Sequence, residues 1–378
     1  MTDTLPTAAV GSGTATEREI SRQPDVWRET GRIVRSRRTE LDAFLAPLLA
    51  EPRLRIVLTG AGTSAFVGEV AAPGLARRLH RRIEAVATTD LVSDPLGRLA
   101  EDVPTLLVSF ARSGNSPESL AATALADQVL ERVHHLVITC DASGGLSAAH
   151  EGRERSFVLL TPERANDAGF AMTSSFTSML LSVLLAFLGD DDAVVEALAG
   201  AGEQVLGRRD RIEALAARGA ERVVYLGSGP LTGVARESAL KMLEITAGGV
   251  DTYFDSALGF RHGPKAVLDD RTLVVAYVSA DAYTREYDAD MIRELRGGIG
   301  EEAVVAVRAD APRSAGDWGL DGLSGIDDAW LAVPYVVVGQ LLALHASVRS
   351  GVETDDPFPG GSVNRVVQGV TIHPLAGR

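Results

Sequence analysis

The sequence predicts an α/β protein built from two similar units, each with a parallel sheet, behind an N-terminal helical segment. After Pro52, short apolar runs alternate with helical patterns, which is typical of parallel strands covered by helices on both faces. The segment RIVLTGAG (55–62) also has a counterpart 167 residues later, RVVYLGSG (222–229). Each copy precedes a helical pattern and a second apolar strand. We therefore expect a duplicated α/β unit.

The N-terminal region, residues 1–50, is expected to contain a polar tail and helix. Thr16 to Glu19 has the spacing of a capping box, which indicates that a helix begins there, and Pro24 is expected to interrupt it near its start. A further helical pattern covers residues 27–49.

The two units are expected to span residues 51–200 and 201–378, joined by helices between 173 and 218. A Gly-rich turn after the first strand leads into a helix that continues to Arg78. The expected strands are short apolar runs, at 54–58, 83–87, 105–110, 133–140 and the edge segment 157–160, and then at 222–226 and 273–279.

Composition excludes several classes of protein. The formal net charge of −14 repels phosphate backbones, so we expect no nucleic-acid partner. The one cysteine, Cys140, excludes a disulfide framework and argues against a cysteine-based metal site. The first 18 residues lack the pattern of a signal peptide. The apolar run Met179–Leu188 is about half of the ~20 residues that a membrane span needs. We expect a cytoplasmic protein.

The first Gly-rich turn, Gly60 to Ala65, is open to two interpretations. It fits the loose G-x-G-x-x-A dinucleotide pattern, and Glu84 lies where a ribose-binding acid would be expected. A nicotinamide dehydrogenase is therefore one hypothesis, which a titration with NAD(H) would test. The hydroxyls of Thr63 and Ser64 suit a single phosphate better.

The turn after the next strand favours a phosphate site. Ser116 is a good N-cap and Pro117 a good first helical residue, so a helix N-terminus with unpaired N–H groups is expected here. Those N–H groups, with the hydroxyls of Ser113 and Ser116, would hold an anion, and Gly114 lets the turn close over it. The second unit reads VSADAY (278–283) at the equivalent place. We therefore expect one phosphate site per chain, formed by the first unit.

The second unit offers proton-transfer groups. Lys241 and Glu244 lie three residues apart on a largely apolar helical segment, 237–247, and so share a face. A carboxylate in such a setting would have a raised pKa unless Lys241 offsets the burial. His262 lies in a tight Gly/Pro-closed loop, where an imidazole suits proton transfer near neutral pH. His150, in contrast, is expected at the surface.

These motifs together resemble a known family. The segments GAGTS (60–64), SFARSGNS (109–116), GFAMTSSF (169–176), GFRHGP (259–264) and DPFPGGSVNRVVQGVTI (356–372) resemble the sugar isomerase (SIS) domain proteins. More narrowly, they resemble the tagatose-6-phosphate ketose/aldose isomerase or galactosamine-6-phosphate deaminase group, which is related to the isomerase half of glucosamine-6-phosphate synthase. The resemblance implies two tandem SIS-type, flavodoxin-like αβα subdomains.

The resemblance also implies roles for individual residues. Glu244 would move a proton between C1 and C2, Lys241 would assist, and His262 would open the sugar ring from a neighbouring subunit of a homodimer or larger homo-oligomer. The substrate and its phosphate would be held by the matching polar residues, namely Thr63, Ser64, Arg112, Ser113, Ser116, Thr173, Ser174 and Asn364.

The implied activity is an aldose–ketose isomerisation that needs no cofactor or metal. Its substrate would be an amino sugar 6-phosphate, with galactosamine-6-phosphate giving tagatose-6-phosphate and ammonia. The alternative is a non-catalytic, regulatory SIS protein that binds a sugar phosphate. Two positions depart from the synthase: Ala111 replaces a phosphate-binding serine and Gln368 a C-terminal lysine. Asn364, Arg365 or His345 are candidates to replace that lysine.

Overall fold

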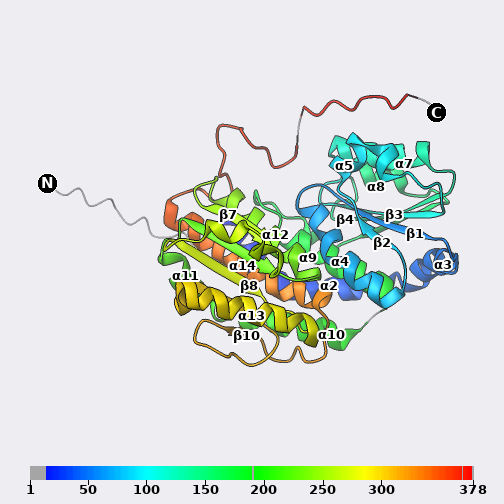
Figure 1. Cartoon of the computed structure of the whole chain (residues 1–378). Helices are drawn as coiled ribbons and strands as arrows, with labels where there is room; N and C mark the ends of the chain where they lie inside the picture. Colours follow the sequence, from blue (N-terminus) through cyan, green and yellow to red (C-terminus); the bar gives the residue numbers. More distant parts are fainter. Residues whose placement is uncertain (1–13, 190, 368, 377–378) are drawn as a thin grey trace.

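The computed structural model describes residues 14–189, 191–367 and 369–376. Two five-stranded parallel sheets form its framework, one in each half of the chain (Figure 1). The first sheet has the order β2-β1-β3-β4-β5 and consists of β1 (Arg55–Thr59), β2 (Ile83–Ala85), β3 (Thr105–Ala111), β4 (Val133–Thr139) and β5 (Ser156–Leu160). The second has the order β10-β9-β8-β6-β7 and consists of β6 (Arg222–Gly227), β7 (Asp251–Asp255), β8 (Thr272–Tyr277), β9 (Val304–Arg308) and β10 (Trp318–Gly319).

The two sheets have the same topology. Replacing β1 through β5 by β6 through β10 converts one strand order into the other, read from the opposite edge. The matched segments form β1 and β6, and the second apolar strands form β3 and β8. The predicted fold class, with two parallel-sheet units behind helices, is therefore confirmed. Three strands of the second sheet, β7, β9 and β10, were not predicted from the sequence.

Helices cover the sheets and fill the space between them. The N-terminal helices are α1 (Ala15–Ser21), α2 (Gln23–Ser36) and α3 (Arg38–Leu49). The first half continues with α4 (Thr63–Leu79), α5 (Thr88–Ser93), α6 (Pro95–Arg98), α7 (Pro117–Val129), α8 (Gly145–His150) and α9 (Ser174–Leu188). The rest are α10 (Asp192–Leu206), α11 (Arg209–Ala217), α12 (Pro230–Ile245), α13 (Ala282–Ile299) and α14 (Asp328–Ser350), with short 3-10 turns η1 (Glu163–Ala165), η2 (Gly259–Arg261), η3 (Pro264–Val267) and η4 (Glu301–Ala303).

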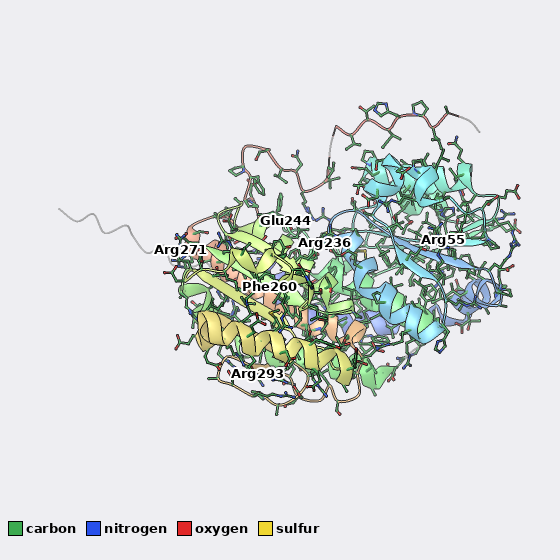
Figure 2. All side chains as sticks on the ribbon, in the orientation of Figure 1. Arg55, Arg236, Glu244, Phe260, Arg271 and Arg293 are labelled. Carbon is green, nitrogen blue, oxygen red and sulfur yellow. The ribbon has the colours of Figure 1, made fainter. Side chains whose placement is uncertain are left out.

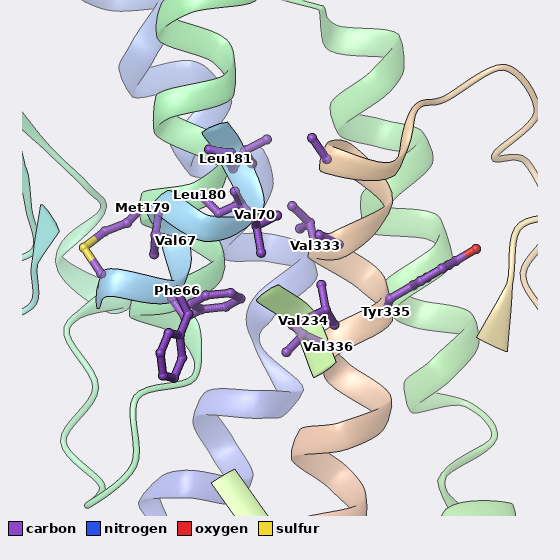
Figure 3. Close-up of a cluster of buried hydrophobic side chains, with 14 of the residues drawn as sticks. Phe66, Val67, Val70, Met179, Leu180, Leu181, Val234, Val333, Tyr335 and Val336 are labelled. Carbon is purple, nitrogen blue, oxygen red and sulfur yellow. The ribbon is translucent and has the colours of Figure 1, made fainter. Parts of the chain in front are cut away.

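The largest hydrophobic core joins the two halves. Helices α4 and α9 of the first half pack together, and α4 also packs on α12 of the second half, which in turn packs on α14. Figure 3 shows Phe66, Val70, Val234 and Val336 meeting in this core. Each fully buried side chain of this size contributes about 1.5–3 kcal/mol, so this shared core holds the two sheets together.

The contact between α4 and α12 reflects the duplication. Glu69 and Arg236, which occupy equivalent positions 167 residues apart, form an ion pair across it. Gly233 allows the close approach, because a Cβ atom there would lie 2.7 Å from Val70 Cγ2. The N-terminus of α4 and the C-terminal half of α12 are thereby held side by side.

The N-terminal region differs from the prediction. Thr14, not Thr16, is the N-cap of α1, and its hydroxyl accepts a hydrogen bond from the N–H of Glu17. Thr16 instead donates to Asp355 Oδ1 at 2.7 Å, a contact that no local pattern reveals. Pro24 lies in the first turn of α2 and so starts a new helix, where proline is well tolerated. The pattern at 27–49 is divided between α2 and α3.

Helix α14 is longer than the apolar helix α9, which contains the run Met179–Leu188. By length and composition it is the one helix among the described residues that could cross a membrane. However, 83% of its apolar window is buried inside this protein. It serves here as a core helix between the two halves (Figure 1).

Candidate active site

A small cavity lies at the carboxyl ends of β1 and β3, where ligands usually bind in parallel α/β sheets. Its volume is about 110 Å³. Hydroxyls of Ser64, Ser113 and Ser116, all predicted from the sequence, line it together with Arg112. Ser119, Met172 and the C-terminal residues Arg365 to Val367, which were not assigned to the phosphate site from the sequence, also line it.

The turn between β3 and α7 has the expected shape. Gly114 has a φ of +66°, which a residue with a side chain rarely adopts, and its carbonyl accepts the N–H of Leu146 at 2.9 Å. Ser116 is the N-cap of α7, but its hydroxyl pairs with Ser119 Oγ at 2.6 Å and makes no cap hydrogen bond. Pro117 has no N–H group, and the N–H of Ser119 donates to the carbonyl of Ser116 at 3.1 Å. The backbone N–H of Glu118 therefore remains available to an anion at this helix start.

Arg112 is the buried cation of the cavity. The residue is 7% exposed, and its Nη2 donates to the carbonyl oxygen of Arg365 at 3.2 Å. Its Nη1 is buried without a hydrogen-bond partner among the described residues. Burial lowers the pKa of Arg112, and the nearby Arg365 lowers it further. An anion in the cavity would offset both effects.

The predicted pair on α12 is not a solvent-exposed salt bridge. Lys241 is 1% exposed, and its Nζ contacts Glu244 Oε2 while lying 3.5 Å from Glu237 Oε1. Lys241 Nζ also donates to Thr63 Oγ1 at 2.9 Å, across the boundary between the two halves. Burial opposes a charged lysine, but the carboxyls of Glu237 and Glu244 outweigh it and raise the pKa of Lys241.

Glu237 is a site residue that sequence reasoning missed. It is fully buried one turn before Lys241, and burial raises its pKa to about 8, although Lys241 works in the opposite direction. A buried carboxyl with a raised pKa was predicted on this helix, but the prediction named Glu244 as that residue. The side chain of Glu244 is instead 25% exposed, so a substrate can reach it. The i, i+4 spacing of Glu237 and Lys241 was the available signal.

Figure 2 shows Glu244 and Arg236 near the boundary between the halves, with Phe260 deeper in the second half. Phe260 is fully buried and holds the loop that follows it, which contains His262. His262 is exposed, and its backbone N–H donates to the carbonyl of Gly259 at 2.9 Å. Its imidazole makes no hydrogen bond or ion pair with the residues that the structure describes. The structure therefore does not connect His262 with Glu244 inside one chain.

Thr173 and Ser174, predicted to bind the substrate, do not line the cavity. Both are buried at the start of α9, where their backbone N–H groups donate to Asp167. The Ser174 hydroxyl donates to the carbonyl of Glu19 at 2.7 Å. These bonds fix the loop that places Met172 in the cavity wall.

The C-terminal candidates lie in different places. Asn364 is exposed and outside the cavity lining, whereas the adjacent Arg365 lines it. His345 lies on α14, where burial lowers its pKa, and is not among the lining residues. Gln368 lies outside the described residues. Among the described residues, no group of three or more His, Cys, Asp or Glu is arranged to hold a metal ion.

The second half fills the equivalent position with its own carboxylates. The N–H and hydroxyl of Ser279 bind Asp288 and Asp328, at 2.9 and 2.5 Å, and the N–H of Ala280 binds Asp328 at 2.7 Å. Asp281 caps α13 through the N–H groups of Tyr283 and Thr284. The backbone donors that would hold an anion are thus already occupied.

One histidine of the first half also differs from expectation. His150, expected at the surface, is 1% exposed and its ring centroid lies 4.6 Å from that of His135. His135 Nε2 hydrogen-bonds Asp127 at 2.8 Å, and His150 Nδ1 bonds Ser156 at 3.0 Å. Burial lowers the pKa of His150 to about 4.

Comparison with known proteins places this geometry in a family. Residues 48–189 match the SIS domain model, and relatives align along almost the whole chain, so the chain belongs to the SIS domain family. A Streptomyces coelicolor protein that carries the AgaS name is 59% identical over 372 residues, 96% of each chain.

Two further proteins are similar over their full length. D-galactosamine-6-phosphate deaminase AgaS of Shewanella sp. (strain ANA-3) is 42% identical over 363 residues, which cover 95% of this chain and 92% of the relative. The crystal structure of tagatose-6-phosphate ketose/aldose isomerase from Escherichia coli has a TM-score of 0.90 and 42% identity, covering 98% of this chain and 99% of that one. The resemblance inferred from the motifs is confirmed.

Proposed function

We propose that this protein converts an amino sugar 6-phosphate, most specifically galactosamine-6-phosphate, into tagatose-6-phosphate with release of ammonia. One observation carries the proposal: Lys241, beside Glu244, donates to Thr63, the residue that precedes cavity-lining Ser64. An anion pocket and an accessible carboxylate are thereby held next to each other. The names of the Shewanella and E. coli relatives support the same substrate class.

The geometry supports a carbon-acid mechanism. With the phosphate held in the cavity, Glu244 would remove the proton from C2 and return it at C1, through an enolamine. The aldose carbon C1 is thereby reduced to a hydroxymethyl group, while C2 becomes an imine. Water then adds to C2 and ammonia leaves, which gives the ketose. The buried Lys241 would hold the Glu244 carboxylate in position and favour the negative charge that develops on the substrate.

His262 would open the sugar ring from a second subunit. It is exposed, and two large apolar side chains near the proposed site are exposed as well, Leu243 on α12 at 44% and Leu258 in the histidine loop at 43%. Apolar side chains beside a polar catalytic group suit a contact between subunits. We therefore propose a homodimer or larger homo-oligomer, working in the cytoplasm on a small-molecule sugar phosphate, without nucleic acid or membrane.

The proton-transfer role is tested by Glu244→Gln. We expect this variant to lose exchange of the C2 proton with deuterated water, followed by NMR, and to retain sugar-phosphate binding. Glu286→Gln, which changes an exposed glutamate of α13, is the matched control. Retained C2 exchange in Glu244→Gln would show that another group removes the proton.

A panel of hexose and hexosamine 6-phosphates, assayed for both ketose and ammonia, tests the substrate class. Ketose with ammonia supports deamination, and ketose from a neutral sugar supports simple isomerisation. Binding without turnover of any member would favour the regulatory alternative. The cluster of buried Lys241 and Glu237 beside the accessible Glu244 weighs against that alternative, because a sensor gains nothing from desolvated proton-transfer groups.

The dehydrogenase hypothesis has little support at Glu84. Although its partial burial works in the opposite direction, hydrogen bonds from Arg55 and Arg82 lower the pKa of this carboxyl. Arg55 Nη2 lies 2.6 Å from Glu84 Oε2. A carboxylate engaged by two guanidinium groups is poorly placed to bind a ribose hydroxyl.

A further inference from the structure

The C-terminal segment returns from the second half to the cavity of the first. After α14, Asp355 accepts the first N–H groups of α1, and Phe358 packs on Phe170 with ring centroids 5.4 Å apart. The segment then lines the cavity at residues 365–367, and Leu375 packs against the first half. Figure 1 shows this segment, in red, running across to the first half.

We propose that Arg365 supplies a second cation for the substrate phosphate, next to Arg112. The identity of the ligand rests on the proposed function, but the anion site itself is argued from the cavity. The side chains that line it are small, apolar or hydroxyl-bearing, apart from these two arginines, and no carboxylate is among the described lining residues. Asp167 and Glu19, outside this lining, interact electrostatically with Arg112, but they do not outweigh its burial and the nearby Arg365. Two cations in the lining with this incomplete compensation indicate that an anion belongs there.

Both guanidinium groups have donors to spare. Arg112 Nη1 is buried without a partner, an arrangement that is costly unless a ligand provides the acceptor. Arg365 is exposed at the cavity and donates through Nη2 to the carbonyl oxygen of Asp167. It makes no other side-chain hydrogen bond or ion pair with the described residues. A guanidinium has five N–H donors, so most of those of Arg365 remain for a phosphate.

The position of Arg365 also addresses the missing hydroxyl at Ala111. Ala111 lines the cavity but offers the ligand no side-chain donor. A guanidinium makes two parallel bonds to phosphate oxygens and is stronger than one hydroxyl. The two arginines are already linked, because Arg112 Nη2 donates to the backbone carbonyl of Arg365 at 3.2 Å. That bond holds the C-terminal segment at the cavity.

Calorimetric titration of the full-length protein with inorganic phosphate tests the proposal without turnover. We expect Arg365→Gln to bind phosphate about 10- to 100-fold more weakly than the native protein, as for the loss of hydrogen bonds to a charged group. Arg365→Lys keeps the charge but loses the paired donors and should fall between the two. Arg293→Gln removes the same charge from an exposed site on α13, so it is the matched control and should bind normally.

Hydrogen exchange gives an independent measurement. Phosphate should protect the backbone amides of residues 363–367 in the native protein and in Arg293→Gln, but much less in Arg365→Gln. With a turned-over substrate, Arg365→Gln should raise KM at least tenfold and change kcat by less than threefold.

Phosphate binding by Arg365→Gln within twofold of the native protein would overturn the role of Arg365, even if the enzyme deaminates its substrate. Conversely, the expected loss of phosphate binding would stand even if no hexosamine phosphate were turned over. No phosphate binding by the native protein would overturn the anion site altogether.

Discussion

The buried carboxyl of Glu237 makes the stability of this protein depend on pH in a direction that can be calculated. Its pKa rises from 4.5 in the unfolded chain to about 8 in the folded one. Because the pKa is higher in the folded chain, the protonated carboxyl makes its full contribution to the free energy of unfolding below pH 4.5. This contribution is lost progressively as the pH rises through 8. Glu237→Gln keeps the shape and stays neutral, so it should not suffer this loss.

The expected magnitude follows from the pKa values. Where the folded carboxyl is protonated and the unfolded one ionised, stability falls by at most about 1.4 kcal/mol per pH unit. Between pH 5 and 8 the upper bound is therefore about 4 kcal/mol. Because Glu237 is coupled to Lys241, we expect the variant to gain about 2–4 kcal/mol over the native protein across this range.

The measurement is urea unfolding of the native protein and Glu237→Gln at pH 5, 6, 7 and 8. The difference in free energy of unfolding between the two cancels the other titrating groups, and Glu286→Gln controls for loss of one carboxyl. A difference that stays constant within about 0.5 kcal/mol would refute the reasoning. It would mean that Glu237 is ionised beside Lys241 when the protein is folded.

Three further predictions concern the folded state. Burial lowers the pKa of His150 to about 4, so neutral His150 contributes its full share of the free energy of unfolding above pH 6.5, and this share is lost as the pH falls toward 4. His150→Asn should reduce the loss of stability at acid pH by about 1–3 kcal/mol, measured by urea unfolding. The same dependence of stability on pH in the variant and the native protein would contradict this. Asp328→Ala should lower the free energy of unfolding by about 2–4 kcal/mol, because it leaves the buried donors of Ser279 and Ala280 unpaired. Asp327→Ala, which removes only the N-cap of α14, should cost about 1 kcal/mol, and equal losses in the two variants would refute this. Gly169→Ala should lower Tm, since its Cβ would lie 2.5 Å from Thr16 Oγ1 at a contact fixed on both sides, and an unchanged Tm would show that this contact relaxes.

The sequence predicted the central strands β6 and β8 of the second sheet and missed both of its edge strands and β9. Strand β9 is fully buried and mostly apolar, so its own residues carried a signal that was overlooked, whereas the edge strands were missed for a physical reason. Central strands such as β3 are buried along their whole length and therefore read as uninterrupted apolar runs. Strand β7 is partly exposed and carries aspartate at both ends, and β10 has only two residues. Such short or polar strands are defined by their neighbours, so their own residues carry little signal.

The site shows the same division between local and long-range information. Ser113 and Ser116 were predicted because both lie in one continuous turn, the turn between β3 and α7. Lys241 and Glu244 were predicted because they share one face of a helix. The mistaken cap at Thr16 has the opposite cause, since its partner Asp355 is 339 residues away. The polar contact between Thr63 and Lys241 likewise joins the two halves, and only the packing of α4 on α12 creates it.

The duplication also gives a reason why only one of two similar units is proposed to bind an anion. Both units place backbone N–H groups at the end of their third strand in the chain, β3 or β8, and such groups attract negative charge. In the second unit the carboxylates of this chain supply the negative charge, because Asp288 and Asp328 accept the backbone N–H groups of Ser279 and Ala280. Burial raises the pKa of both carboxyls, and the hydrogen bonds of the turn oppose this rise. The turn of the first unit instead has Arg112 and several hydroxyls beside an open cavity, to which the C-terminal segment adds Arg365. The second unit thus holds carboxylates of its own chain at this turn, whereas the first unit, in the function proposed above, keeps its donors for the phosphate of a substrate.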